Sequence, residues 1–381
     1  MHTRVIAQDV LSRRSVAIVF NGEGYDLVPT SEEPSGLFIS PGWMDLQVNG
    51  FGGLDINAPI LRADDVRAIT ARLWQEGVTA WCPTLISAPY EQVKTSLAVL
   101  AQACEMDDQV RSCVAGIHLE GPYISPLEGA RGAHAAQFIR PPDWEEFTRW
   151  QDAAGGRIRI VTLAPEQPGA IEMIQRLAHS GVLAALGHTH ASTADIHRAV
   201  TAGARLSTHL GNGIEAYLPR HPNPIWDQLA EDRLAASLIF DGFHLPSQVM
   251  KVMLRSKGID GCLLISDATS LAGMPPGRYE TTVGGSVELR PDGRLSLAGT
   301  DYLAGSASSL KSGVENAIRW AGVTLSEAVR LAAVNPARLL SFDQNAMTLF
   351  ALDSSSGQIT TWAAGLNGRA VYRNPMTPVG G

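Results

Sequence analysis

The sequence of 381 residues is poor in cysteine and has no pattern of paired cysteines. Cys82, Cys104, Cys113 and Cys262 are scattered along the chain, and no two of them form a C-x-x-C motif. Scattered cysteines of this kind are typical of buried, reduced thiols rather than of a disulfide framework. We therefore expect a protein of the cytoplasm.

Long apolar runs and basic runs are also missing. No apolar stretch approaches the roughly 18 residues that a membrane-spanning helix needs, and the first twenty residues lack the apolar core of a signal peptide. Charged residues make up only 18% of the chain and the net charge is −8. Nucleic-acid binders carry a basic surface, so we expect neither a nucleic-acid partner nor a membrane partner.

What the sequence does have is a series of short, nearly continuous apolar runs. Such runs are typical of strands buried on both faces of a parallel sheet. Eight of them lie between Trp43 and Ala268, namely "WMDLQVNG", "VTAWCPT", "VAGIHLEGP", "IRIVTLAPE", "VLAALGHTH", "ARLSTHLGNG", "ASLIFDGFH" and "CLLISDA".

Most intervals between these runs show helical periodicity. One example, "ADDVRAITARLWQEG", places Val66, Ile69 and Leu73 on one face before Gly77 ends the helix. Eight alternating strands and helices predict an α/β protein with a TIM-like (β/α)8 barrel. The interval 210–235 contains three prolines and predicts a long functional loop with a short helix.

The two ends of the chain differ from this pattern, since they are rich in Val, Ile, Thr and Gly and show little helical periodicity. We predict that residues 1–40 and 345–381 together form a small β-sandwich domain, while residues 41–344 form the barrel. A hairpin is expected over 279–299, because an Asp292-Gly293 turn interrupts it. Helical segments at 308–321 and 325–333 are expected to close the barrel.

Polar residues gather where the predicted strands end. They are Gln47, Asn49, Glu120, Glu166, His188, His190, His209, Asn212, Asp241, His244 and Asp267. The carboxyl ends of the strands form the active-site face of a (β/α)8 barrel, so these side chains should converge. Taken singly, a histidine there could be a hydrogen-bonded rim residue, and a glutamate could cap a loop.

Together, Glu120, His188 and His209 supply the carboxylate and two imidazoles of an open catalytic metal site. One divalent ion is expected, with zinc first, although iron, cobalt and manganese accept the same ligands. A bound metal lowers the pKa of water toward about 7, and Asp267 would stand in the same pocket as the general base. His118 shares a face with Glu120 one layer down, and we expect it to pack behind the ligands.

The motifs also carry a family resemblance over nearly the whole chain. In order they are "PGWMDLQVNGFGG", "GIHLEGPYI" with "GAH" after it, "VTLAPE", "GHTHAS", "STHLGNGI", "DGFHLP", "LISDAT" and "LAGSASSL". With these motifs the chain resembles the N-acetylglucosamine-6-phosphate deacetylases of the amidohydrolase superfamily. The resemblance implies removal of acetyl from an N-acetylated amino sugar 6-phosphate.

By that resemblance Glu120, His188 and His209 would bind the metal, and Asp267 would be the catalytic acid/base. His134 would polarise the acetyl carbonyl. The remaining substrate contacts implied are Ala133, Asn212, Gly213, Arg220, His244, Leu303, Ala304 and Gly305. Arg220 and His244 would hold the 6-phosphate, in a family where a neighbouring subunit contributes to that site, so a homodimer is implied.

Some positions depart from the usual pattern, among them "THLGNGI", which stands where the family usually has a "THLxNAM"-like sequence. Gln47-Val48-Asn49 stands where many amidohydrolases have His-x-His and two metals, so one metal is expected. "LPRHPNPIWDQL" replaces a shorter substrate loop. A deacylase for a non-phosphorylated or different N-acyl compound is therefore the alternative. A non-catalytic sugar-binding barrel is a further one, which predicts that a metal ligand or the base is missing, whereas all four residues are present.

Overall fold

The structure, a computed structural model, describes residues 2–281 and 285–375. Eight parallel strands form its central sheet, in the order β14-β13-β12-β11-β10-β9-β8-β5. An isolated parallel bridge between Val48 and Ala268 joins the two outer strands and closes the sheet into a barrel. The strands are β5 (Trp43–Val48), β8 (Val78–Ile86), β9 (Ile117–Glu120), β10 (Ile158–Leu163), β11 (Leu183–Leu186), β12 (Leu206–Ser207), β13 (Ala235–Ile239) and β14 (Cys262–Ile265). All eight predicted strands are confirmed.

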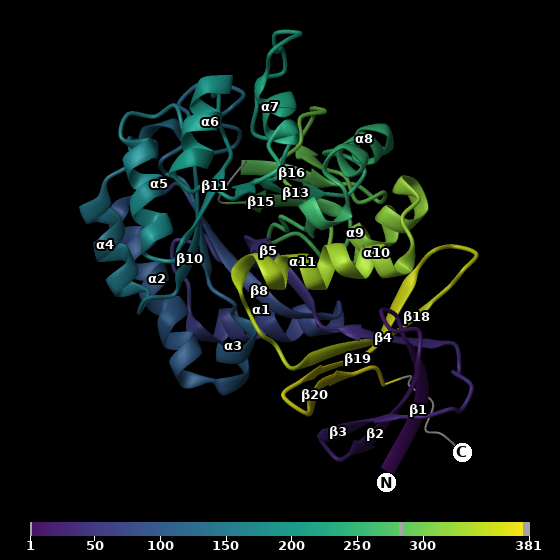
Figure 1. The fold of residues 1–381 in the computed structure, drawn as a ribbon. Coiled ribbons are helices and arrows are strands. Elements are labelled where there is room, and N and C mark those ends of the chain that lie inside the picture. The colour runs from purple at the N-terminus through teal and green to yellow at the C-terminus, as the bar shows by residue number, and fades with distance from the viewer. Residues whose placement is uncertain (1, 282–284, 376–381) are drawn as a thin grey trace.

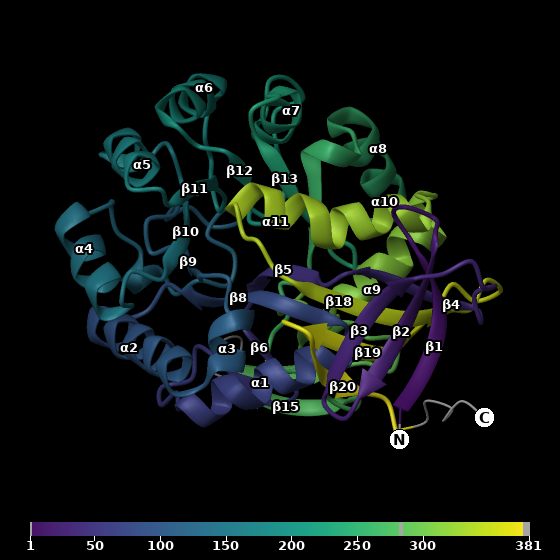
Figure 2. The same cartoon turned by 60° about the horizontal axis from the view of Figure 1, so that its bottom comes forward.

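Helices follow the strands and surround the barrel, as Figure 2 shows for the arc from α1 to α8. They are α1 (Ala63–Gln75), α2 (Tyr90–Met106), α3 (Asp108–Cys113), α4 (Trp144–Ala153), α5 (Ala170–His179), α6 (Thr193–Ala202), α7 (Pro224–Ala230), α8 (Ser247–Lys257) and α9 (Leu310–Asn316). The interval 210–235 is a long loop with one short helix, α7, as predicted.

After α9 the chain continues through α10 (Leu325–Val329) and α11 (Asn335–Leu340), with short π-helical turns between them. This matches the helical segments predicted at 308–321 and 325–333. Asn335 on α11 donates from its side chain to the carbonyls of Ile259 and Cys262, at 2.7 Å each. These bonds fasten the last helix to the start of β14.

Alternating residues of the barrel strands divide between two cores. On β14, Cys262 and Leu264 pack in the large cluster toward the surrounding helices, whereas Leu263 and Ile265 pack in the cluster inside the barrel. Because both faces of such a strand are buried, successive residues along it are apolar, and this explains the continuous apolar runs in the sequence. The inner cluster fills the amino-terminal half of the barrel and leaves the carboxyl ends of the strands to polar residues.

The two ends of the chain meet in one small β-domain, which lies beneath the barrel in Figure 1. Its strands are β1 (His2–Asp9), β2 (Ser15–Asn21), β3 (Gly24–Pro29), β4 (Leu37–Pro41), β18 (Ala346–Leu352), β19 (Ile359–Leu366) and β20 (Arg369–Arg373). They form a single closed sheet rather than two facing sheets. The predicted domain of both termini is thus present, and its sheet curls into a barrel. Residues 376–381 lie outside the described residues, and the predicted boundaries at 40 and 345 stay predictions.

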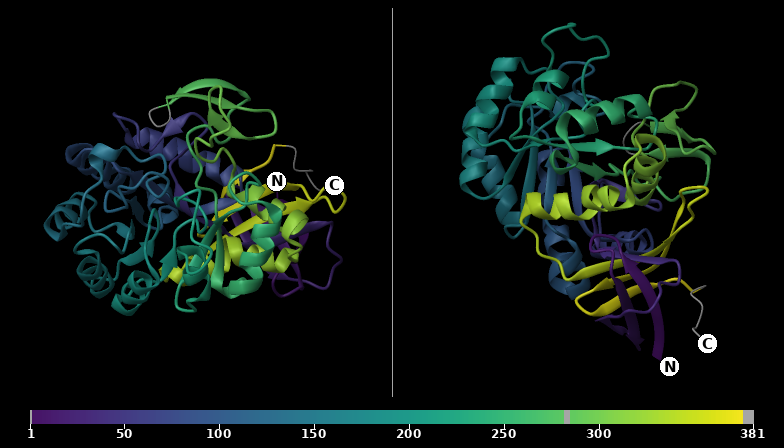
Figure 3. Two further views of the ribbon diagram at one scale, coloured as in Figure 1. Left: turned by 90° about the horizontal axis from the view of Figure 1, so that it is seen from above. Right: turned by 45° about the vertical axis from the view of Figure 1, so that its right-hand side comes forward.

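A three-stranded antiparallel sheet stands at the edge of the molecule (Figure 3). It consists of β15 (Gly277–Thr281), β16 (Gly285–Leu289) and β17 (Leu295–Leu297), and a small hairpin of β6 (Gly50–Phe51) and β7 (Leu54–Asp55) follows β5. The predicted turn at Asp292-Gly293 joins β16 to β17, with the Gly293 N–H donating to the Arg290 carbonyl. Residues 282–284 of the predicted hairpin lie outside the described residues.

All four cysteines are buried and none is in a disulfide, as expected. Within residues 2–281 and 285–375, no helix is long and apolar enough to cross a membrane.

Candidate active site

A cavity of about 320 Å³ opens at the carboxyl ends of the barrel strands. The predicted residues that line it are Glu120, Ala133, His134, His188, His209, Asn212, Gly213, His244, Asp267, Leu303, Ala304 and Gly305. The structure therefore brings together every predicted site residue except Arg220. That arginine is exposed on the loop before α7 and does not line the cavity of its own chain.

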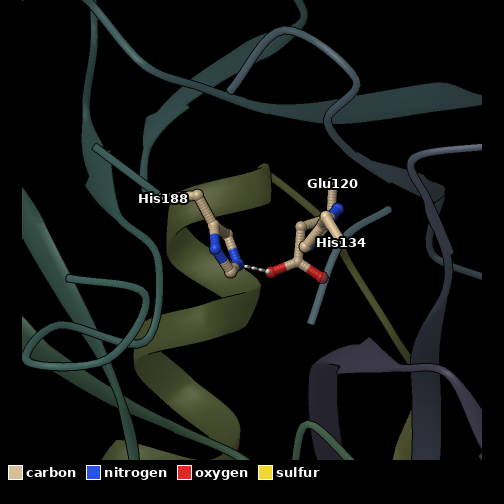
Figure 4. A group of neighbouring side chains, drawn as sticks. All are labelled: Glu120, His134 and His188. Carbon is tan, nitrogen blue, oxygen red and sulfur yellow. Dashed lines mark hydrogen bonds and ion pairs between the residues drawn. The ribbon is translucent and has the colours of Figure 1, made fainter. Parts of the chain in front are cut away.

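Three of these side chains meet at one point. The Nε2 atom of His209 lies 2.8 Å from Oε1 of Glu120 and 3.0 Å from Nε2 of His188. His188 Nε2 lies 3.2 Å from the same carboxylate oxygen, a contact drawn in Figure 4. All three residues are buried. His134 is close by, since Glu120, His134 and His188 each offer a ligand atom within 4.8 Å of the others.

The hydrogen bonds of His188 indicate that a cation fits between these groups. Nδ1 of His188 lies 3.0 Å from the carbonyl oxygen of Ala130, which can only accept a hydrogen bond, so Nδ1 carries the proton. In the neutral ring Nε2 then presents its lone pair to the Glu120 carboxylate, which is repulsive unless a positive charge lies between them. An imidazole held in this way by a backbone carbonyl is a common feature of metal-binding histidines.

Burial by itself would raise the pKa of the Glu120 carboxyl. A positive charge on or between the neighbouring His188 and His209 imidazoles outweighs that effect and holds the pKa well below the usual range. The side-chain amide of Gln47 also donates to Oε1 of Glu120, at 2.8 Å. The carboxylate is therefore held ionised and oriented by three neighbours.

Asp267 stands at the end of β14, enclosed by protein but partly open to the cavity. Burial, with the negative charge of Glu120 second, raises the pKa of Asp267 to about 8. The Asn49 side-chain amide donates to its Oδ1 at 2.8 Å. Gln47 and Asn49 thus each orient one acidic side chain of the site, Glu120 and Asp267 respectively.

His134 reaches the cavity from the loop after β9. Burial lowers the pKa of its imidazole to about 3, with the neighbouring His188 imidazole acting second and in the same direction, so the ring is neutral at pH 7. Its Nδ1 atom contacts Ser87, at 2.9 Å from the hydroxyl oxygen and 3.4 Å from the backbone nitrogen. The ring of His188 lies edge-on to that of His134, with 4.4 Å between centroids.

The backbone is strained at this site. Only six non-glycine residues in the described part of the chain have positive φ, and three are His188, His209 and Asp267, at 49°, 32° and 50°. Residues held in this region typically cost about 1–3 kcal/mol each and cluster at functional sites. Gly213 contributes to the close packing, since a Cβ there would lie 2.7 Å from Nδ1 of His188.

Some polar strand ends support the site from outside the cavity. Glu166 accepts hydrogen bonds from the Thr189 hydroxyl at 2.5 Å and from the His190 backbone at 2.7 Å, and so holds the turn after His188. His118 has both ring nitrogens engaged, with the Leu46 carbonyl at 3.1 Å and the Thr162 hydroxyl at 2.7 Å. It is buried and does not line the cavity, in keeping with the expected packing role.

Asp241 supports the cavity wall through His244. Its Oδ2 lies 2.6 Å from Nδ1 of His244, and its Oδ1 accepts the backbone N–H of the same histidine at 2.9 Å. Burial of Asp241 acts to raise its pKa, but the bond to His244 prevails and the pKa is lowered. The ionised Asp241 thus holds the His244 ring in place at the cavity wall.

Sequence reasoning missed several lining residues, among them Asp55, Asn57 and Thr269. It also missed Ser87 behind His134. The second apolar run was interpreted as ending at Thr84, whereas β8 continues to Ile86 and places Ser87 at its carboxyl end. Extending that run by two residues would have shown a polar strand end like the others.

The amidohydrolase family model matches residues 38–348. The chain belongs to this family. It is 33% identical to N-acetylglucosamine-6-phosphate deacetylase of Bacillus subtilis, over 83% of this chain and 80% of that protein. It is 32% identical to N-acetylgalactosamine-6-phosphate deacetylase of Escherichia coli O157:H7, over 80% of this chain and 78% of that protein.

A solved structure with the same fold contains a sugar phosphate. It is N-acetyl-D-glucosamine-6-phosphate deacetylase of Mycobacterium smegmatis, in a mutant form, in complex with N-acetyl-D-glucosamine-6-phosphate. The TM-score is 0.83 at 27% identity, with 97% of this amidohydrolase and 99% of that chain covered.

Proposed function

We propose that this amidohydrolase removes the acetyl group from an N-acetylated amino sugar 6-phosphate, with N-acetylglucosamine-6-phosphate as the first expectation. The observation that carries the proposal is the shared cavity, in which the Glu120, His188 and His209 donors lie beside Asp267 and His134. A non-catalytic barrel would have no need for a strained backbone at three of these five positions.

Glu120, His188 and His209 would hold one divalent ion, with zinc expected first and iron, cobalt or manganese also suited to these ligands. When bound, such an ion lowers the pKa of water and polarises a carbonyl oxygen. Its positive charge would also act against the raised pKa of Asp267, and so favour the ionised base.

Two side chains of the protein would then take part in the reaction, one by proton transfer and one by hydrogen bonding. Asp267, oriented by Asn49, takes a proton from the water that attacks the acetyl carbon. His134 donates an N–H hydrogen bond to the carbonyl oxygen as negative charge develops on it. Asp267 then gives the proton to the leaving amine, which yields acetate and the free amino sugar.

The 6-phosphate requires a cation that the cavity wall does not supply. Among the described residues, no lysine or arginine lines the cavity, while Asp55, Glu120 and Asp267 do. Of the lining residues that the structure describes, His244 is the one that we propose for the phosphate. A phosphate dianion beside three carboxylates needs a further donor, and Arg220 would offer a bidentate fork.

We propose that Arg220 reaches the cavity of a second copy in a homodimer. The segment that precedes α7 projects from the body of the molecule in Figure 1. It exposes Arg220 together with Tyr217, whose relative exposure is 94%. An exposed aromatic side chain next to an exposed arginine suits an interface between proteins. The cytoplasmic location also stays a prediction.

The test of the main proposal is acetate release over a panel of sugars, after metal analysis of the purified protein. The panel holds N-acetylglucosamine, N-acetylgalactosamine and both 6-phosphates, because the relatives named above differ in this sugar. We expect the highest kcat/KM for N-acetylglucosamine-6-phosphate. Equal turnover with and without phosphate would favour the alternative, a deacylase of non-phosphorylated compounds. No acetate from any of them would overturn the proposal.

Arg220→Ala tests the phosphate site. It should cost roughly 1.5–3 kcal/mol in kcat/KM for the phosphorylated sugar, the usual worth of a hydrogen bond to a charged group, and little for the neutral sugar. Arg111→Ala, an exposed arginine on α3 far from the site in sequence, is the control. Two variant proteins, Arg220→Ala and Asp267→Asn, can also be mixed so that they form mixed dimers. If Arg220 acts on the partner's cavity, the cavity that retains Asp267 then receives an intact Arg220 from its partner, and activity should be restored. Equal losses on both sugars would contradict the assignment.

A further inference from the structure

Ser87, which directly follows the second barrel strand β8, makes two contacts with the same nitrogen of His134. Its backbone N–H points to Nδ1 at 3.4 Å, and its hydroxyl oxygen lies 2.9 Å from Nδ1. Both residues are buried, at 4% relative exposure each. None of the expectations drawn from the sequence gave Ser87 a role.

The backbone contact shows which tautomer His134 adopts, and the closer hydroxyl contact strengthens that preference. A backbone N–H can only donate, so Nδ1 must accept and cannot carry a proton itself. In the neutral ring the proton is therefore on Nε2. The hydroxyl of Ser87 can add a second donated hydrogen bond to Nδ1.

The tautomer matters because His134 would face the acetyl carbonyl. A proton on Nε2 makes the ring a hydrogen-bond donor to the oxygen on which negative charge develops. The other tautomer would present a lone pair there and repel the charge. We propose that Ser87 is a positioning residue that fixes the Nδ1-accepting tautomer of His134, so that Nε2–H is available for oxyanion stabilisation.

The approach of Ser87 to His134 is built into the surrounding backbone. The side-chain oxygen of Asn57 accepts the Ile86 N–H at 2.9 Å and anchors the segment just before Ser87. Gly121 leaves the space, because a Cβ at its φ of +83° would lie 2.5 Å from Ser87 Oγ. Arg131 donates to the His134 carbonyl at 2.9 Å and holds the other side of the contact.

The catalytic part of this inference rests on the proposed deacetylase function, whereas the tautomer itself does not. The experiment therefore has two readouts, steady-state kinetics and ¹⁵N–¹H NMR of the histidine rings in the metal-containing protein. His134→Gln identifies the His134 ring signals by their loss. The variants are Ser87→Ala, Ser87→Thr as the conservative replacement, and Ser96→Ala on α2 as a buried serine outside the cavity lining.

In the wild type we expect a proton on Nε2 of His134 and none on Nδ1. Ser87→Ala removes the hydroxyl at 2.9 Å and leaves only the longer backbone bond at 3.4 Å. We therefore expect the preference for Nε2 to weaken, the ring signals to shift toward a mixture of tautomers, and kcat to fall about five- to tenfold, in keeping with one hydrogen bond. KM should change little, since the bond to the oxyanion forms mainly in the transition state. Ser87→Thr should restore most of both readouts, and Ser96→Ala should leave both unchanged.

A wild-type His134 protonated on Nδ1 would overturn the tautomer assignment, whether or not the protein deacetylates sugars. A Ser87→Ala protein with altered ring signals but wild-type kcat would overturn the catalytic part. A fall in kcat with unchanged ring signals, or the same fall in Ser96→Ala, would reduce Ser87 to a packing residue. If the wild type releases no acetate, the NMR arm still tests the tautomer, and the proposed function fails separately.

Discussion

The molecule contains two closed sheets that differ in what they bury. The seven-stranded sheet of the termini is filled with apolar side chains such as Ile18, Phe20 and Leu349. Its buried polar residues, Thr3, Ser40, Thr348 and Thr361, are all uncharged. The parallel barrel buries Asp45, His118, Glu120, His188 and His209 instead, at relative exposures between 1% and 7%.

This difference shows how one chain separates stability from chemistry. Burying a charge is unfavourable unless it is paired. The parallel barrel accordingly places Glu120, His188 and His209 at the carboxyl ends of its strands, where they contact one another. Asp45, in the middle of β5, instead accepts the backbone N–H groups of Gln47 and Ser266. The terminal sheet carries no such cost, and its core can contribute to stability alone. Removing a polar group from the parallel barrel should change activity, while removing an apolar group from the terminal sheet should change stability.

The largest expected effect is on metal binding. His188→Ala or His209→Ala removes one of the three proposed ligands and should cut bound metal far below the wild-type amount and abolish activity, with the fold retained. Elemental analysis and circular dichroism check this, with His179→Ala, an exposed histidine on α5, as control. Wild-type metal content in both variants would refute the ligand assignment.

The next effect is on the base. Asp267→Asn keeps the shape of the side chain but cannot take up the proton, so kcat should fall at least about 10²-fold with metal still bound. Kinetics on metal-loaded protein measure this. A near-normal kcat would mean that another group in the cavity, with His244 next in line, acts as the base.

The terminal sheet should respond in the opposite way. Leu349 is fully buried, and Leu349→Ala should lower the free energy of unfolding by about 2–5 kcal/mol through lost contacts and a cavity. The kcat of the folded protein should not change. Urea unfolding and kinetics on the same sample test both points, with half-exposed Leu27→Ala as the matched control. A large fall in kcat would show that the two sheets are not independent.

The smallest expected effect is a pH dependence of stability from Asp45. Burial raises the pKa of Asp45 from 3.8 to about 6. Between these values the folded state keeps a proton that the unfolded state has lost, so the contribution of Asp45 is fully present below about pH 3.8 and is lost as the pH rises through about 6. The free energy of unfolding should therefore change by at most about 3 kcal/mol over this pH range through Asp45. Unfolding of wild type and Asp45→Asn at several pH values measures it, and parallel curves would contradict it.

Glu32, between β3 and β4 of the terminal domain, supplies a control in which stability depends on pH in the opposite direction. Its hydrogen bond to Arg4 lowers the pKa of this exposed carboxyl from 4.5 to about 2. The contribution of Glu32 is therefore present above pH 4.5 and is lost as the pH falls toward 2. Glu32→Gln should leave the loss of stability between about pH 4 and 6 in place.

The two sheets also differ in how much of them the sequence could predict. The parallel strands are encoded locally, because each continuous apolar run such as that of β14 must be buried on both faces. The ends of such strands then predict the site, which is why Glu120, His188, His209 and Asp267 could be chosen. Ser87 was missed because Pro83 and Thr84 looked like the end of a strand that in fact continues to Ile86.

The terminal sheet was predicted only in outline. Its closure depends on pairs such as Ile39 with Leu349, and no local pattern specifies which distant strands pair. Arg220 could be named from the family resemblance, but its position outside the cavity depends on how the loop before α7 folds. Loops are set by their surroundings more than by their own residues, so the sequence alone did not place it.

The pairing of β4 with β18 has a consequence for the newborn protein. These strands lie about 300 residues apart, so at a synthesis rate of roughly 5–20 residues per second the first waits on the order of 15–60 s for the second to emerge. Over that interval β1 to β4 form an incomplete sheet, with Ile18, Phe20 and Ile39 lacking part of their apolar surroundings. The whole catalytic barrel is thus synthesised after β1 to β4 and before β18 to β20, although these two groups of strands form one domain.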